Sequence, residues 1–396
     1  MKTKNDQLYT PTFFLALTLN FTVGLIFTNN AIYPLYVESQ GGSAAQIGLF
    51  VSAYAIAAVL SRPLVGMLID RFGVRLVLIG GSLLMALAPL GFLTTLGEGL
   101  SPLAWTLRVV QGFGFGAYFS AFFTLAAQMA PTERRNEAVA MYGITGLAAN
   151  LVGPVMGEQI VRIWGLSEFF IVMTVAGLVA TFVATRFKAT GDLKPSAFSL
   201  ETLAATLKSR QLYFPLILAM LLAISFSTPA GFLAPLAGIR NINGFGLYFT
   251  SYAAAGIILR LIGRKWADRF GWRRILIPMF CLYGCGLTVI YFSYTIAGLI
   301  LAGSLTGSAH GLAFPAVTSL GYTMAPEKGK GTAMALVTGM MDLGSFITGI
   351  VLGQIAQLMG FAAAFPFAVL APIAAISLLI IHVIRNPQRF ARAAKS

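Results

Sequence analysis

The sequence contains little charge and few of the residue types from which active sites and metal centres are built. Only 10% of its 396 residues are charged, whereas soluble domains carry about 25%. Two histidines and two cysteines are too few for a typical metal cluster, and no nucleotide-binding loop or nucleophile elbow occurs. Cys281 and Cys285 lie in one apolar run and predict packing thiols without a disulfide. The sequence therefore predicts a protein that is not an enzyme and binds no cofactor or metal.

Hydrophobic residues make up 57% of the chain and are grouped into twelve long apolar runs. A run of about 20 such residues is long enough to cross the hydrocarbon core as a helix. The sequence thus predicts an all-α membrane protein with twelve transmembrane helices. The expected spans cover residues 12–37, 45–69, 75–97, 101–129, 138–163, 166–187, 212–238, 246–267, 274–294, 296–324, 332–358 and 361–384.

The distribution of basic residues predicts which ends of the spans face the cytoplasm. If the N-terminus is cytoplasmic, 22 of the 27 lysines and arginines lie in cytoplasmic segments, while only Arg162 and Arg240 lie in outside loops. This asymmetry predicts a multi-pass protein of the cytoplasmic (inner) membrane with both termini in the cytoplasm. The first apolar run is too long for a cleavable signal and is interpreted as the first span. Topology and anionic lipid also explain the net charge of +14 without a nucleic-acid partner.

A charged turn occurs twice and divides the chain into two halves. Residues 70–73 read Asp-Arg-Phe-Gly and recur at 268–271, an offset of 198 that Arg62 and Arg260 share. Both copies follow an outward-to-inward span, so we expect two pseudo-symmetric six-helix bundles in parallel orientation. Such repeats are typical of transporters that work by alternating access.

We expect the N-terminal bundle at residues 1–187 and the C-terminal bundle at 212–396, joined by a cytoplasmic central loop at 188–211. Leu200, Leu203 and Leu207 would share one face of a short helix, which predicts an element lying on the membrane surface. A simple tether is the alternative.

The charged turn resembles the loop signature of the major facilitator superfamily, whose fold also has twelve spans and a central loop. The match lies at Gly66, Asp70, Arg71, Gly73 and Arg75; the second copy keeps Asp268, Arg269 and Gly271 but has Arg264 where the repeat would place glycine. The resemblance implies a gating latch, in which the charges pair across the two halves and the glycines allow a tight turn and close packing. The alternative is that these charges only set topology.

A second signature lies in the fifth span, where Gly153, Pro154 and Gly157 resemble the glycine–proline motif of the drug–proton antiporter branch. The resemblance implies that this motif helps to close the outer side of the transporter, which favours export over import. Proline kinks a helix and glycine allows close packing against a partner. An ordinary kinked span is the alternative.

A third signature lies in the fourth span, where Arg108, Gln111 and Gly112 resemble the family pattern of arginine, glutamine and glycine. A charge at this depth is costly and needs water, a partner or a ligand. Glu158, at similar depth on the fifth span, is the expected partner of Arg108. The alternative is an arginine that extends to the outer interface.

Three ionisable residues are candidates for proton coupling. Asp342 is the carboxylate closest to the middle of a span, and His310 is expected at similar depth on the neighbouring tenth span. Imidazole titrates near neutral pH, and a carboxyl group in a span can bind and release a proton. We expect Asp342 and His310 to form a pair, with Glu158 as a further candidate. A structural pair is the alternative.

Spans one, four, seven and ten line the substrate cavity in this family, and here they are aromatic and weakly polar. The candidate cavity residues are Arg108, Gln111, Asn29, Asn30, Tyr33, Phe115, Tyr118, Phe226 and Phe314. This lining suits an amphipathic or ring-bearing organic molecule. The first span lacks the acidic residue that many proton-coupled exporters of this type carry.

The sequence therefore predicts a secondary active transporter that exports a small amphipathic molecule in exchange for protons. We expect a monomer surrounded by membrane lipid. A proton-coupled importer or uniporter of a sugar or metabolite, or a lipid-moving or receptor protein on the same fold, remains open.

Overall fold

The computed structural model describes residues 9–129, 135–187, 206, 208–263, 266, 271–326 and 329–385, and these are almost entirely helical. Ten of the helices in this part of the chain are long and apolar enough to cross a membrane, and a shorter apolar helix covers Gly246–Ile262. The expected surface helix of the central loop, and the expected gating residues Asp268 and Arg269, fall outside these ranges.

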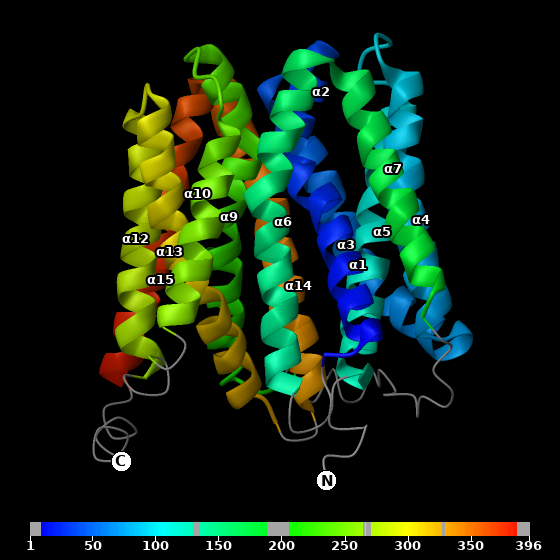
Figure 1. Cartoon of the computed structure of the whole chain (residues 1–396). Coiled ribbons are helices and arrows are strands. Elements are labelled where there is room, and N and C mark those ends of the chain that lie inside the picture. Colours follow the sequence, from blue (N-terminus) through cyan, green and yellow to red (C-terminus); the bar gives the residue numbers. More distant parts are fainter. Residues whose placement is uncertain are drawn as a thin grey trace. The chain divides into compact units, whose positions relative to one another are not determined.

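The chain divides into two compact units, Met1–Phe198 and Ser199–Ser396. The elements of the first unit, labelled in Figure 1, are α1 (Pro11–Thr28), η2 (Asn29–Ile32), α2 (Tyr33–Ser39), α3 (Ala44–Phe72), α4 (Val74–Phe92), η3 (Leu93–Thr95), α5 (Pro102–Met129), α6 (Arg135–Ile163) and α7 (Leu166–Thr185). The first predicted span is thus one helix interrupted by a 3-10 segment at η2.

The second unit repeats this series of spans. Its elements are α9 (Tyr213–Ile239), α10 (Gly246–Ile262), α12 (Trp272–Phe292), α13 (Ile296–Thr323), α14 (Lys330–Met359), η6 (Phe361–Ala363) and α15 (Ala364–Arg385). Each expected span coincides with a helix to within a few residues. The helices α6 and α10 are not among the ten in the described part of the chain that are long and apolar enough to cross a membrane by composition alone.

The helices begin and end at residues whose chemistry explains the boundary. Ser43 accepts a hydrogen bond from the Gln46 backbone and the Gln46 side chain accepts one from Ser43, which forms a capping box at the start of α3. Gly73 ends α3 at φ +81° and Gly271 begins α12 at φ +76°, conformations that other residues rarely adopt. The repeated glycine therefore makes the same turn in both units.

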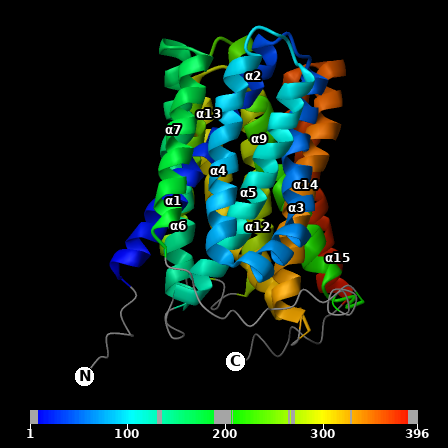
Figure 2. The same cartoon turned by 90° about the vertical axis from the view of Figure 1, so that its right-hand side faces the viewer.

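Helices pack in matching pairs within each unit. In the first unit α5 packs against both α3 and α4, α4 against α7, and α1 against α6 (Figure 2). In the second unit α13 packs against both α10 and α12, α12 against α15, and α9 against α14. Each unit thus builds its core in the same way.

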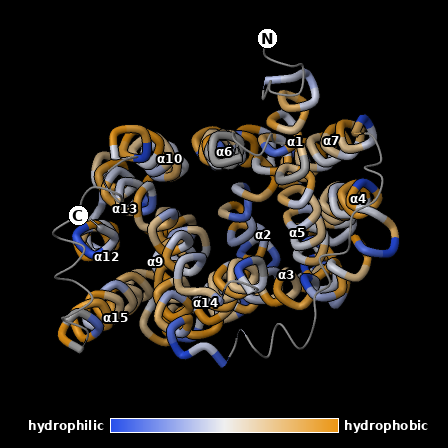
Figure 3. Tube along the Cα trace, turned by 90° about the horizontal axis from the view of Figure 1, so that it is seen from below, coloured by the Kyte–Doolittle hydropathy of each residue, from blue (hydrophilic) through white to orange (hydrophobic). Residues whose placement is uncertain are grey.

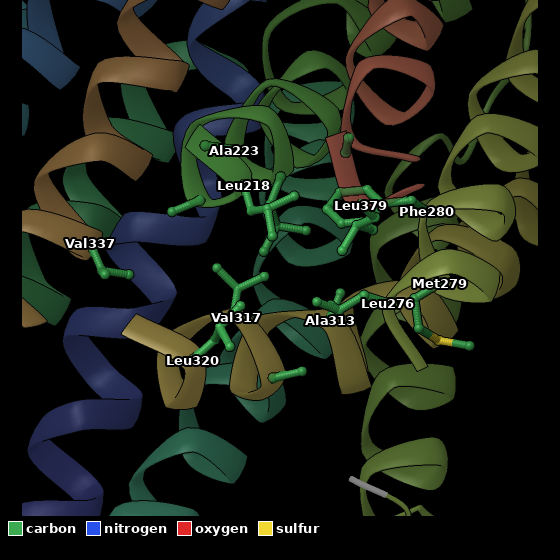
Figure 4. Packing of buried hydrophobic residues seen from close by; sticks show 14 of the residues in the cluster. Leu218, Ala223, Leu276, Met279, Phe280, Ala313, Val317, Leu320, Val337 and Leu379 are labelled. Carbon is green, nitrogen blue, oxygen red and sulfur yellow. The ribbon is translucent and has the colours of Figure 1, made fainter. Parts of the chain in front are cut away.

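The second unit contains a large apolar core cluster. Leu218, Leu276, Phe280, Val317 and Leu379 come from four helices and share one buried cluster (Figure 4). The hydropathy-coloured trace shows apolar residues around the helices of both units and few hydrophilic positions within them (Figure 3). Helices that are apolar on all sides are stable in lipid, where only the interior polar groups need partners.

Candidate functional site

The first unit encloses a buried polar network centred on Arg108 in α5. The guanidinium of Arg108 is 1% exposed. It donates from Nε to the Phe50 carbonyl at 3.0 Å, and from Nη1 to Asn30 Oδ1 at 2.7 Å and to Gln111 Oε1 at 2.8 Å. Gln111 Nε2 donates in turn to the Tyr33 hydroxyl at 2.7 Å. Four of the predicted cavity residues, Arg108, Gln111, Asn30 and Tyr33, therefore form one network.

Aromatic rings close around the same guanidinium. Arg108 Cζ lies 4.4 Å from the ring centre of Tyr33, 4.6 Å from that of Tyr54 and 5.1 Å from that of Phe50. Ring faces attract a desolvated cation. The expected pairing with Glu158 is not what the structure shows, because the hydrogen-bond partners of Arg108 are neutral. Depth alone did not identify them, since the break at η2 brings Asn30 and Tyr33 to α5.

The glycine–proline motif of α6 packs against that same break. A Cβ atom added to Gly153 would overlap Thr28 Oγ1, and one added to Gly157 would overlap Asn29 Oδ1. Asn29 is fully buried; its amide donates to the Leu25 carbonyl at 2.8 Å, while its Oδ1 has no hydrogen-bond partner in the structure. The close packing expected of these glycines is confirmed, and the segment that they contact is η2 and the end of α1.

Phe115 and Tyr118, the remaining cavity candidates of the first unit, follow this network along α5. Tyr118 is 2% exposed and donates to Asn20 Oδ1 at 3.4 Å. Phe115 stacks on Phe27 with ring centres 4.5 Å apart. Their burial indicates a packing role for both rings in this conformation.

In the second unit His310 of α13 lies within a group of aromatic rings. His310 Nδ1 is 2.8 Å from the Tyr283 hydroxyl. Its ring centre lies 5.6 Å from Phe226, 5.5 Å from Tyr252 and 5.3 Å from Phe314. The hydrogen bond of His310 therefore goes to Tyr283, and not to Asp342 as expected. The reason is that α13 packs closely against α12, which carries Tyr283.

The two carboxylates proposed for proton coupling lie in different units. Asp342 is a half-buried residue of α14, and Glu158 is a buried residue of α6, 7% exposed. Both are within predicted spans, so each remains a candidate for proton binding.

The gating candidates are placed differently from one another. Asp70 and Arg71 are exposed at the end of α3. Arg75 Nη2 donates to the Thr185 carbonyl at 2.7 Å, at the C-terminal end of α7, where a cation is favoured by the helix dipole. The contact that the structure gives Arg75 is therefore within the first unit. No described atom lies within 4 Å of a Cβ added to Gly66, so close packing does not explain that glycine.

A correspondence that the sequence did not reveal links the two polar sites. Tyr252 lies 198 residues after Tyr54, but His310 and Phe314 lie 195 residues after Phe115 and Phe119. In the first unit Phe115 contacts Tyr54 and Phe119 with ring centres 5.7 and 5.6 Å apart. These contacts match those that His310 makes with Tyr252 and Phe314.

Glycines on α5 and α13 confirm this register. Gly112 packs on the Tyr54 carbonyl as Gly307 packs on the Tyr252 carbonyl, again 195 residues apart along the fourth span of each half. His310 therefore occupies the place of Phe115, and Gly303, which packs on the Tyr248 carbonyl, occupies the place of Arg108. The offset changes from 198 to 195 between these helices, which hid the match from the sequence repeat.

Each unit is a bundle of membrane helices with a buried polar centre, an arrangement typical of membrane transporters. The family model of the Major Facilitator Superfamily matches residues 13–245 and 215–396. The chain belongs to this superfamily: it is a multi-pass membrane transporter of small molecules and not an enzyme.

Relatives and solved structures agree with this assignment. The chain is 26% identical over 353 residues to the staphylopine export protein of Staphylococcus aureus, covering 84% of this chain and 86% of that protein. Over 38% of this chain and 27% of the relative, it is 30% identical to a multidrug resistance protein B homolog of Mycobacterium tuberculosis. A variant of the nucleoside transporter NupG has the same fold, with TM-score 0.78 and 12% identity over 93% of this chain and 99% of NupG.

Proposed function

We propose that this protein is a proton-coupled exporter of a small amphipathic organic molecule in the cytoplasmic membrane, with both termini in the cytoplasm. Export is supported by similarity to the staphylopine export protein and by the glycine–proline motif packed on η2. The inside orientation is supported by the 22 basic residues in the segments assigned to the cytoplasm. A monomer is sufficient for this activity, because each half supplies its own polar centre.

The observation that carries the proposal is the placement of titratable groups within the second unit. His310 replaces the phenylalanine of the first unit and forms a hydrogen bond with Tyr283. Asp342 lies in α14, which contributes Val337 and Met341 to the same core cluster as α13. Ionisable residues inside spans are costly and commonly belong to proton or substrate pathways. Here Asp342 would carry the coupled proton, and His310 would tune its release.

The cavity residues and the charged turn complete the proposed cycle. Phe226 and Phe314 are half-buried beside His310 and offer ring faces to an apolar ligand. The Arg108 network holds the first span in shape, and the turn at Asp70, Arg71 and Gly73 acts as a latch between conformations. A proton then drives export because the two conformations bind it with different affinity.

The test uses everted membrane vesicles with an acidic interior and a panel of amphipathic fluorescent dyes, including ethidium. The wild-type protein should accumulate at least one dye against its gradient. Asp342→Asn should abolish this accumulation but retain dye binding, because asparagine has the size of the neutral acid. Glu168→Gln, at an exposed acid in the first turn of α7, is the matched control and should transport normally.

Accumulation by Asp342→Asn at the wild-type rate would contradict the assignment of the coupling site, and Glu158 would be the next candidate. Dye movement that ignores the pH gradient in the wild type would identify a uniporter. Movement of dye with the protons, and not against them, would identify an importer.

A further inference from the structure

An apolar groove lies between α12 and α15 of the second unit, on a side of these helices that does not face the core. Its volume is about 480 Å³, within the range of roughly 300–1,000 Å³ typical of small-ligand sites. Cys281, Gly284, Cys285 and Thr288 line it from α12, and Pro372 and Ile373 line it from α15. Both cysteines are exposed. Figure 4 shows the core-facing packing of the same helices at Leu276 and Leu379.

The first unit offers an internal comparison, because α4 and α7 are the helices that correspond to α12 and α15. Ala86 of α4 is fully buried, and a Cβ added to Gly177 of α7 would lie only 2.6 Å from the Ala86 Cβ. Gly284 lies 198 residues after Ala86, and a Cβ added there would be 3.7 Å from Pro372 and 3.9 Å from Val369. The helix pair is therefore closed in the first unit and open in the second.

The chemistry of the groove limits what can occupy it. None of the described residues that line it is charged. The hydroxyl of Thr288 is already bonded to the Gly284 carbonyl at 2.8 Å, so the thiols of Cys281 and Cys285, which are weak donors, are what the described lining offers to a polar group. Both helices span the membrane, with mean hydropathies of 2.0 and 2.5, so the medium that reaches the exposed side of the groove is hydrocarbon.

The groove also has the length and depth of a hydrocarbon chain. Cys281 to Val289 extends about 12 Å along α12 at 1.5 Å per residue. Cys281 lies nine residues from the start of α12 at Trp272, which places the groove in the middle and far part of a core about 30 Å thick. The Val289 end of the groove lies three residues before the end of α12 at Phe292. An acyl chain that enters from there and runs parallel to the helices would reach the Cys281 end.

We propose that this groove binds one acyl chain of a membrane phospholipid, which fills the space between α12 and α15 opposite Gly284. The chain gains apolar contact with both helices and removes the void that open packing would leave. Recognition is of the hydrocarbon tail, so the headgroup does not determine binding.

The test is photo-crosslinking of the purified full-length protein in dodecyl maltoside, using phosphatidylcholine with a diazirine in one acyl chain. Crosslinks should concentrate on the peptides that contain Cys281–Val289 and Pro372–Ile376. Dioleoyl phosphatidylcholine and dioleoyl phosphatidylglycerol should compete equally, and dihexanoyl phosphatidylcholine should not. Gly284→Leu places a side chain in the groove, and it should reduce these crosslinks about 10-fold. Gly80→Leu, at an open position on α4, is the control and should leave them unchanged.

Cys281 and Cys285 are the chain's only cysteines, so thiol labelling reports on this groove alone. Dioleoyl phosphatidylcholine should slow their modification by N-ethylmaleimide, and dihexanoyl phosphatidylcholine should not. If Gly284→Leu does not fold, Cys285→Phe fills the groove from an exposed position and should give the same loss of crosslinks.

Several outcomes would overturn the proposal. Crosslinks spread equally over α4, α7, α12 and α15 would indicate bulk detergent or lipid contact only. Preference for one headgroup would show that the tail is not what is recognised. Protection that rises with protein concentration, together with disulfide-linked dimers, would assign the groove to a second copy of the chain.

Discussion

The two halves of this transporter contain the same aromatic arrangement around different polar residues. Phe27, Tyr54, Phe115 and Phe119 surround the middle of α5 in the first half; Phe226, Tyr252, His310 and Phe314 occupy the corresponding places around α13. About two turns earlier on the same helix, the first half has Arg108 where the second half has Gly303. The repeat therefore conserves ring packing and changes the position and type of the ionisable group.

This difference assigns distinct tasks to the halves. Arg108 is a permanent cation whose donors are bound to the Phe50 carbonyl, Asn30 and Gln111, so it holds η2, α3 and α5 together. His310 is an ionisable residue inside a span and makes its hydrogen bond to a single hydroxyl, that of Tyr283. The first half is thus held together by a buried cation, whereas the second half contains the groups that we propose to respond to protons.

Replacement of Arg108 should have the largest effect on the folded protein. Arg108→Leu leaves three buried acceptors without their donor, at about 1–3 kcal/mol for each. We expect loss of most folded protein after purification, measured by size-exclusion chromatography. Arg108→Lys should fold but transport poorly, because one ammonium cannot reproduce the planar set of donors.

A double-mutant cycle sharpens this prediction. Arg108→Lys combined with Asn30→Ala should be less harmful than the sum of the two single changes, since both remove the same hydrogen bond. Arg108→Lys combined with Glu158→Gln should be additive. Coupling of Arg108 to Glu158, and none to Asn30, would support the pairing that the similar depth of Arg108 and Glu158 predicts.

The motif on α6 predicts the next largest effect. Gly157→Ala places a Cβ where Asn29 Oδ1 lies, and such overpacking costs about 1–3 kcal/mol. The thermal unfolding temperature should fall, and transport should fall with it. Gly146→Ala, on the same helix with no described atom within 4 Å, should change neither. Asn29→Ala should partly rescue Gly157→Ala; failure of rescue would show that another contact is responsible.

The repeated turn predicts a smaller effect that is equal in the two halves. Gly73→Ala and Gly271→Ala each force an alanine to positive φ, at a cost of about 1 kcal/mol. Both should lower the unfolding temperature by a similar amount, whereas Gly66→Ala should not. Unequal effects of the two turn substitutions would mean that one turn has a role beyond its backbone geometry.

Much of this architecture follows from the sequence, because hydropathy specifies spans and the recurrence of Asp-Arg-Phe-Gly specifies the repeat. Arg108, Gln111, Tyr33 and Asn30 were identified individually as cavity residues. Their arrangement as one network was not predictable, since Asn30 is 78 residues from Arg108 and reaches it through a break in a helix that reads as continuous. Helical periodicity does not encode such a break.

The partners of the ionisable groups were the least predictable part. Depth along a span placed Glu158 beside Arg108 and Asp342 beside His310, but depth does not specify which face of a helix a residue occupies. The sequence pattern does not single out Tyr283, because a tyrosine in an apolar run is equally consistent with packing. The match between Phe115 and His310 was hidden by the three-residue change in offset.

Exchanging the rings at Phe115 and His310, which differ between the halves, should have the smallest effect on folding. The same exchange gives the most direct test of the difference between the halves. His310→Phe loses one hydrogen bond, worth about 1 kcal/mol, but the first half shows that phenylalanine fits this arrangement. We therefore expect a stable protein. Arg260, which donates to the Gly311 carbonyl at 3.3 Å, and the hydroxyls of Tyr252 and Tyr283 remain as the neighbouring polar groups.

The decisive measurement is the rate of dye transport in vesicles between pH 5 and pH 8 for the wild type, His310→Phe and Phe115→His. We expect the wild-type rate to change with pH over this range, His310→Phe to shift this pH dependence, and Phe115→His to leave it in place. An unchanged pH profile in His310→Phe would contradict the assignment of proton response to the second half.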